Sequence, residues 1–189
     1  KWKETTVKGS LITLLVSFAV IVAILYGLEP GFVELGGYFD LLFVNTFGMS
    51  YNSGVLFYAF LTLAIFSWAI YEIYKGTNAT LMRVSFLLAI VISGMLFIGD
   101  NLLIPLVLVI ALAVYLFKFM KKVQRRIMAN ILISSLMIFI GFSCYALIII
   151  RSSANLPLDE NSPNTMFALN SYLSRDQYGK TPLLYGPVY

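Results

Sequence analysis

Histidine is absent from this 189-residue chain, and cysteine occurs once, at Cys144 inside an apolar run. Without histidine, the chain cannot supply the imidazole of a serine–histidine–aspartate relay. A single thiol forms no intrachain disulfide and cannot complete a thiolate–imidazole zinc site. These absences exclude several classes of hydrolase and of structural metal module for this chain acting alone. We expect Cys144 to be a small buried residue.

Charged residues are also scarce, at 12% of the sequence, whereas 60% of the residues are hydrophobic. The charges gather between long apolar stretches, as expected if each stretch crosses hydrocarbon about 30 Å thick. The net charge of +4 does not indicate nucleic acid, because the basic residues flank apolar segments and form no basic face interleaved with aromatic residues. The composition therefore predicts an all-α membrane protein with the lipid bilayer as its solvent.

Five apolar segments are predicted to span the membrane. The first is expected to end at Glu29-Pro30-Gly31. The third and fourth are separated at Gly99-Asp100-Asn101, because one helix over both would be too long for a bilayer. This division places Pro105 in the first turn of the fourth helix, where its missing N–H does little harm. The predicted spans are 9–28, 54–74, 83–99, 102–118 and 128–150, within a transmembrane domain over 1–150.

Residues 32–51 mix aromatic and aliphatic side chains with Glu34, Asp40 and Asn45. A carboxylate at the centre of a bilayer costs about 3 kcal/mol. We therefore expect a short helix in the membrane interface, within the first outer loop, and an ordinary loop is the alternative.

The basic residues set the predicted orientation. Most of the 13 lysines and arginines lie in segments that share one side if the N-terminus is cytoplasmic, and cytoplasmic loops carry such an excess. Five spans then place residues 151–189 outside. We expect a multi-pass protein of a bacterial inner membrane, with a periplasmic C-terminal segment that leads into a further domain.

The tail after residue 150 is rich in groups that bind sugars or phosphates through charge-assisted hydrogen bonds. An arginine just beyond a membrane helix can pair with a lipid phosphate, although capping the helix C-terminus or snorkelling is the alternative role for Arg151. Asp159-Glu160 is a candidate general base or cation site, and two solvated carboxylates are the alternative. From Asn164 a helix is predicted, with Ser162-Pro163 as its start signal. The candidate substrate-binding or lipid-phosphate-binding residues are Arg151, Asn155, Asp159, Glu160 and Asn161.

Two stretches resemble a known family. They are RSSANLPLDENSPNTMFALNSYLSRDQYGKTPLLYG, residues 151–186, and LGGYFDLLFVNTFGMSYNSGVLFY, residues 35–58. Both are similar to segments of large polytopic membrane proteins of Bacteroidetes-type bacteria, formerly catalogued as a domain of unknown function. That family looks related to protein O-mannosyltransferases, which are glycosyltransferases of the GT-C class. The similarity extends over the whole chain, and on this basis we expect the chain to be an internal fragment.

The resemblance implies transfer of a mannose-like sugar from a polyprenyl-phosphate carrier to serine or threonine hydroxyls of acceptor proteins. The sugar donor is then a substrate, no resident cofactor is expected, and a divalent metal is left open. Such families place a catalytic carboxylate in their first non-cytoplasmic loop, near the N-terminus of the full protein. Tyr38-Phe39-Asp40 lies in a later loop. The catalytic residues therefore stay unassigned.

Two other functions are weighed against the transferase. The first is a non-catalytic membrane subunit of an envelope or secretion complex. The second is a transporter, but the predicted spans hold few ionisable groups at their centres, whereas ion pathways and proton relays usually need them.

Overall fold

The structure, a computed structural model, describes residues 6–97, 103–120, 122–154, 157 and 161–179. Within these ranges every regular element is helical, which confirms the all-α prediction. In chain order, the elements are α1 Val7–Ala23, η1 Ile24–Leu28, α2 Glu29–Phe47, α3 Ser53–Lys75, α4 Ala79–Ile92, α5 Leu103–Val114, η2 Tyr115–Phe119, α6 Arg125–Phe142, η3 Ser143–Tyr145, α7 Ala146–Ser153, α8 Met166–Ser174 and η4 Asp176–Tyr178. Of the short elements, η1 and η2 are π-helical, and η3 and η4 are 3₁₀ turns.

In the part of the chain that the structure describes, three helices are long and apolar enough to cross a membrane, namely Val7–Phe47, Ser53–Lys75 and Arg125–Ser153. Two further helices, Ala79–Ile92 and Leu103–Phe119, are apolar but shorter. Each of the five predicted spans therefore overlaps an apolar helix. The number of crossings and their direction stay predictions.

The first helix does not end at Glu29-Pro30-Gly31, so that prediction is wrong. The chain stays helical from Val7 to Phe47 and passes through one π turn at Ile24–Leu28. Here the Glu29 N–H donates to the carbonyl of Ile24, five residues back. Proline lacks an N–H, and its ring clashes with the carbonyl four residues earlier in a regular α-helix. The wider turn just before Pro30 accommodates both effects, so the helix continues.

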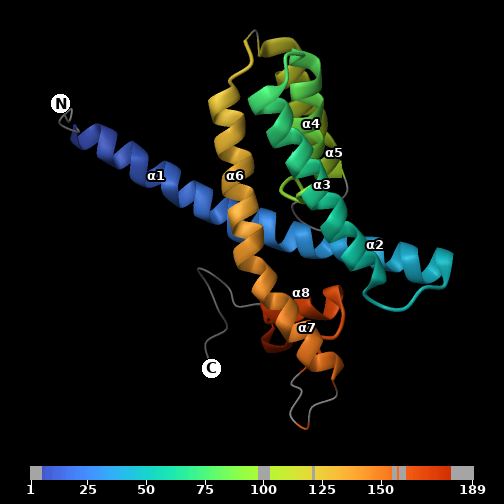
Figure 1. Ribbon diagram of the computed structural model, residues 1–189. Coiled ribbons are helices and arrows are strands. Elements are labelled where there is room, and N and C mark those ends of the chain that lie inside the picture. The colour runs from blue at the N-terminus through green and yellow to red at the C-terminus, as the bar shows by residue number, and fades with distance from the viewer. Residues whose placement is uncertain (1–5, 98–102, 121, 155–156, 158–160, 180–189) are drawn as a thin grey trace.

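The long N-terminal helix runs across the direction of α3 and α6 (Figure 1). The segment α1 buries none of its residues, whereas α2 lies against both α3 and α8 (Figure 1). Phe32 connects α2 to α3 and α6. The centroid of its ring lies 4.6 Å from that of Phe139 on α6, with the two rings stacked, and 5.0 Å from that of Tyr58 on α3. The predicted helix within residues 32–51 therefore exists, but as the second half of a longer one.

The main core lies between α3, α4, η2 and α6, which run side by side at one end of the molecule (Figure 1). A smaller cluster lies where α8 meets α2 and contains Val33, Met166 and Leu169. The buried residues of the main core are Phe66, Ala69, Ile73, Phe86, Ala89, Ile90, Leu116, Met128, Ala129 and Leu132.

The helix α4 ends at Ile92, before the predicted bound at residue 99. The Ser93 hydroxyl donates to the carbonyl of Ile90 and accepts from the N–H of Met95, and Gly94 follows with φ of +76°. A left-handed glycine ends a helix at little steric cost. The predicted turn at residues 99–101 lies outside the described residues. Pro105 lies in the first turn of α5, as predicted.

Cys144 is exposed, so the expectation of a buried thiol is wrong. An apolar run predicts burial from water, but a helix that faces lipid is apolar without being covered by protein.

Candidate functional site

The helix α8 docks on two adjacent glycines of α2. A Cβ atom built on Gly36 would lie 2.8 Å from Cε of Met166, and one built on Gly37 would lie 2.7 Å from the ring of Phe167. A Cβ at either position would therefore force the side chain of Met166 or Phe167 to shift. At the start of α8, Thr165 Oγ1 accepts the Ala168 N–H at 3.3 Å, which satisfies a free donor of the first turn. The helix predicted in the tail is therefore confirmed and held against α2.

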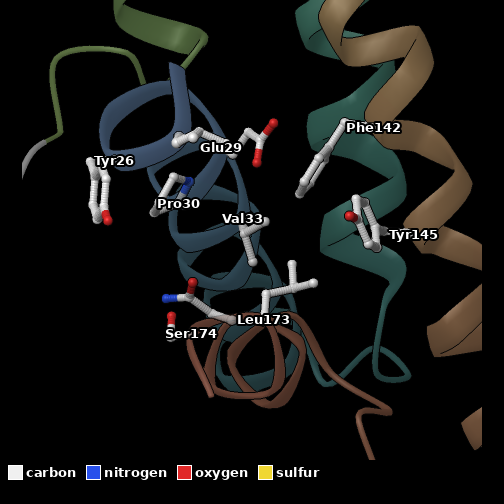
Figure 2. A pocket seen from close by; sticks show the side chains of 10 residues that line it. Tyr26, Glu29, Pro30, Val33, Phe142, Tyr145, Leu173 and Ser174 are labelled. Atoms are coloured by element: carbon white, nitrogen blue, oxygen red, sulfur yellow. The ribbon is translucent and has the colours of Figure 1, made fainter. Parts of the chain in front are cut away.

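A cleft of about 460 Å³ lies where η1 and α2, the α6–η3 junction and α8 come together. Figure 2 shows the Glu29 carboxylate extending from α2 toward Phe142, with the Tyr145 hydroxyl facing the same space. The lining residues are Leu25, Tyr26, Glu29, Pro30, Val33, Phe142, Tyr145, Asn170, Leu173 and Ser174.

The cleft combines one carboxylate with neutral polar groups. None of these lining residues is a lysine or arginine. Glu29 is partly buried, and its carboxylate makes no hydrogen bond to any residue that the structure describes. An ionised carboxylate accepts hydrogen bonds only, while a hydroxyl or an amide both donates and accepts. This set suits a ligand that carries several hydroxyl groups.

An apolar groove of about 370 Å³ adjoins the cleft. Phe142 and Tyr145 line both cavities, so these two rings form a common wall. The groove runs between α3 and the α6–α7 segment, and Phe32, Met166 and Leu169 also line it. Its other lining residues are Val55, Leu56, Ala59, Thr62, Leu63, Leu136, Phe139, Ile140, Ser143, Ala146 and Ile149.

The candidate residues from the sequence lie elsewhere or outside the described part. Arg151 is exposed in the last turn of α7, and its side chain makes no hydrogen bond to a described residue. Asn161 is exposed in a turn, with φ of +63°. Neither residue lines the cleft or the groove. Asn155, Asp159 and Glu160 lie outside the described residues.

The two acids of the predicted interfacial helix have different surroundings. Asp40 is 6% exposed, and its two oxygens accept the backbone N–H groups of Asn52 and Gly54 at 3.0 and 3.1 Å. Glu34 accepts a hydrogen bond of 3.2 Å from the hydroxyl of Tyr38, one turn further along α2. Asp40 is therefore engaged in holding α2 to α3.

The sequence prediction missed Glu29 as a site residue because the Glu29-Pro30-Gly31 run was interpreted as the end of a helix. One sequence signal could have indicated the side of the cleft that α8 forms, across from Glu29. Asn170, Leu173 and Ser174 are spaced by three and four residues, so they share one face of the predicted tail helix. Nothing in the sequence indicates that this face turns toward Glu29.

No group of three or more histidine, cysteine, aspartate or glutamate residues that could hold a metal ion occurs in the part of the chain that the structure describes. The chain matches no protein-family model, no curated protein and no solved structure.

Proposed function

We propose that this chain is part of the membrane region of a glycosyltransferase that moves a mannose-like sugar from a polyprenyl-phosphate carrier to protein serine or threonine hydroxyls. The observation that carries the proposal is the junction of two cavities at Phe142 and Tyr145. One cavity is apolar and the other combines a carboxylate with hydroxyl and amide groups. An amphipathic donor with an apolar tail and a sugar head needs this combination.

In this proposal the apolar groove receives part of the isoprenoid chain, and the cleft receives the sugar. Glu29 binds sugar hydroxyls as an acceptor, and Tyr145, Asn170 and Ser174 supply donors. Because burying a polar group without a partner is costly, a ligand with hydroxyl groups gains affinity by pairing with these side chains.

Arg151 is the proposed contact for the lipid phosphate. It follows Tyr145 by six residues on the same helical segment, which places it about 9 Å further along the axis. A guanidinium pairs with phosphate through two parallel hydrogen bonds. The predicted location is a bacterial inner membrane, with the N-terminus cytoplasmic and the cleft on the periplasmic side. Catalytic residues stay unassigned.

The test measures sugar transfer from a polyprenyl-phosphate donor to acceptor proteins by membranes that contain the complete protein. Glu29→Gln keeps the shape of the side chain and removes its charge. We expect transfer to fall by roughly 10-fold or more, because a charge-assisted hydrogen bond to the sugar is weakened. Arg151→Ala should lower transfer as well, chiefly by weakening donor binding.

Glu34→Gln is the matched control, since Glu34 lies on the same helix, one and a half turns away, and lines neither cavity. Its transfer rate should equal that of the unmodified protein. Wild-type transfer by a folded Glu29→Gln variant would refute the role of the cleft. A chain that transfers no sugar in any background would favour the non-catalytic subunit instead.

A further inference from the structure

A second apolar groove, of about 260 Å³, opens between α4, the α5–η2 segment and α6. It lies away from the cleft and shares no lining residue with it. The packing around it is thin, since Pro105 is the one buried residue described in α5 and Leu116 the one in η2. The lining residues are Phe86, Ile90, Met95, Leu96, Leu112, Tyr115, Leu116, Met120, Gln124, Ile127, Met128 and Ile131.

Basic residues surround one mouth of this groove. The carboxyl ends of α3 and η2 and the amino ends of α4 and α6 meet at the same end of the bundle (Figure 1). Arg83 donates from Nη2 to the carbonyl of Met120 at 2.9 Å, and Met120 itself lines the groove. Further basic residues at this end are Lys75, Lys118, Lys122, Arg125 and Arg126.

The described part of this end holds six basic residues and one carboxylate, that of Glu72 in the last turn of α3, so most of the positive charge has no counter-charge among the described residues. None of these side chains forms an ion pair with a described carboxylate. Arg125 donates from Nη2 to the carbonyl of Gly76, which uses one of its donors. Nε of Arg83 is buried and has no hydrogen-bond partner among the described residues. A guanidinium has five N–H donors, and with Nε enclosed and one Nη2 donor used by Met120, the remaining Nη donors of Arg83 are the ones that can meet an anionic ligand.

We propose that this end of the bundle binds an anionic phospholipid, with one acyl chain in the groove and the phosphate beside Arg83, Lys118, Lys122 and Arg126. Charge complementarity favours a phosphate, and the apolar groove below it favours a lipid over a free anion. Ile127, which lines the groove, and Phe119, which precedes the lining residue Met120, are 54% and 65% exposed and suit a hydrocarbon surrounding. The inference rests on the membrane location in the proposed function and does not depend on sugar transfer.

The test measures which lipid stays on the protein. The chain is reconstituted into bilayers of equal phosphatidylglycerol and phosphatidylcholine, extracted with a mild neutral detergent, and weighed with its bound lipids by native mass spectrometry. We expect phosphatidylglycerol to be retained in preference to phosphatidylcholine. The Lys122→Gln/Arg126→Gln variant should lose about 25-fold of this preference, because each cation near an anionic surface contributes about a factor of five.

The control for charge is Lys8→Gln/Arg175→Gln, which removes the same charge from residues outside this end and should keep the preference. Ile131→Trp fills the groove and should reduce retention of phosphatidylglycerol. Met137→Trp, on the same helix, is exposed and lines no part of the groove, so it should leave retention unchanged.

Three outcomes would overturn the inference. They are equal retention of the two lipids, a preference that survives the double charge variant, and displacement of phosphatidylglycerol by inorganic phosphate. The last outcome would identify a site for free phosphate. Because neither a sugar donor nor an acceptor is present, failure of the proposed transferase activity leaves this result unaffected.

Discussion

Oδ1 of Asp40 accepts the backbone N–H of Gly54 at 3.1 Å, so a carboxylate of α2 closes the amino end of α3. The first N–H groups of a helix have no partner within the helix. Asn52, the residue before α3, supplies no side-chain bond to the helix, and its own N–H donates to Oδ2 of Asp40. The capping charge therefore comes from another helix, which ties capping to tertiary structure.

Asp40→Ala should lower the free energy of unfolding by about 2 kcal/mol, since two backbone N–H groups lose a charged acceptor. Asp40→Asn keeps one acceptor oxygen and should cost less. Thermal unfolding in detergent, followed by circular dichroism, measures both. Glu34→Ala is the control, and a drop as large as that of Asp40→Ala would contradict the capping role.

Gly31→Ala should destabilise the contact between α2 and the turn after α4. A Cβ on Gly31 would overlap the carbonyl of Gly94, and a Cβ on Gly94 would overlap the backbone of Gly31. Since both partners are backbone, neither can move aside cheaply, and we expect a loss of about 2 kcal/mol, within the range for overpacking.

Gly141→Ala provides the comparison, because nothing lies within 4 Å of a Cβ at this helical position. It should be neutral or stabilising by up to about 1 kcal/mol, as alanine is the better helix former. Chemical unfolding of the two variants in mixed micelles ranks them. If both glycines tolerate alanine equally, the close approach at Gly31 is wrong.

Gly36→Leu should release α8 from α2. Even one Cβ would lie 2.8 Å from Cε of Met166, so a leucine takes the space that Met166 fills. The expected readout is faster tryptic cleavage after Arg175, which follows α8 in a left-handed conformation. Gly141→Leu, in open space, should be cleaved at the rate of the unmodified protein, and equal rates for both variants would argue against this docking.

Tyr58→Phe should cost about 1 kcal/mol of stability and leave the fold intact. The buried Tyr58 hydroxyl donates to the carbonyl of Ile92 at 2.6 Å, so its removal leaves the last carbonyl of α4 without this donor. Tyr71→Phe on the same helix is the control, because Tyr71 is 62% exposed. Equal unfolding temperatures for the two variants would show that the hydrogen bond contributes nothing.

Local periodicity and hydropathy predict most of the helices. The apolar runs identify α3 and α6–α7, since composition alone distinguishes such segments. The apolar spacing predicts the tail helix, but the helix begins at Met166 with Thr165 as its N-cap, and not at the predicted start signal Ser162-Pro163. Charged residues and residues typical of turns predict helix ends less accurately. Glu29-Pro30 suggested a helix end because the rule for proline concerns a regular α-helix, and a π turn lies outside that rule.

The candidate cleft could not be predicted, because contacts between distant segments create it. Glu29 and Ser174 are far apart in the sequence and meet only because α8 packs on Gly36 and Gly37. Asp40 looked as available for chemistry as Glu29 in the sequence. The structure distinguishes the two acids. Both oxygens of Asp40 accept backbone N–H groups at the start of α3, whereas Glu29 lines an open cavity.

The π turn at Ile24–Leu28 also determines how far α1 is rotated about the helix axis relative to α2. One extra residue in a helix turns everything beyond it by about 100°. Deleting one residue from this turn would rotate α1 about its axis while α2 stays in place. No side chain of α1 is buried, so none would oppose this rotation. Contacts among the described residues therefore do not fix the rotation of α1 about its axis, and the surroundings of α1 determine which face it turns toward them.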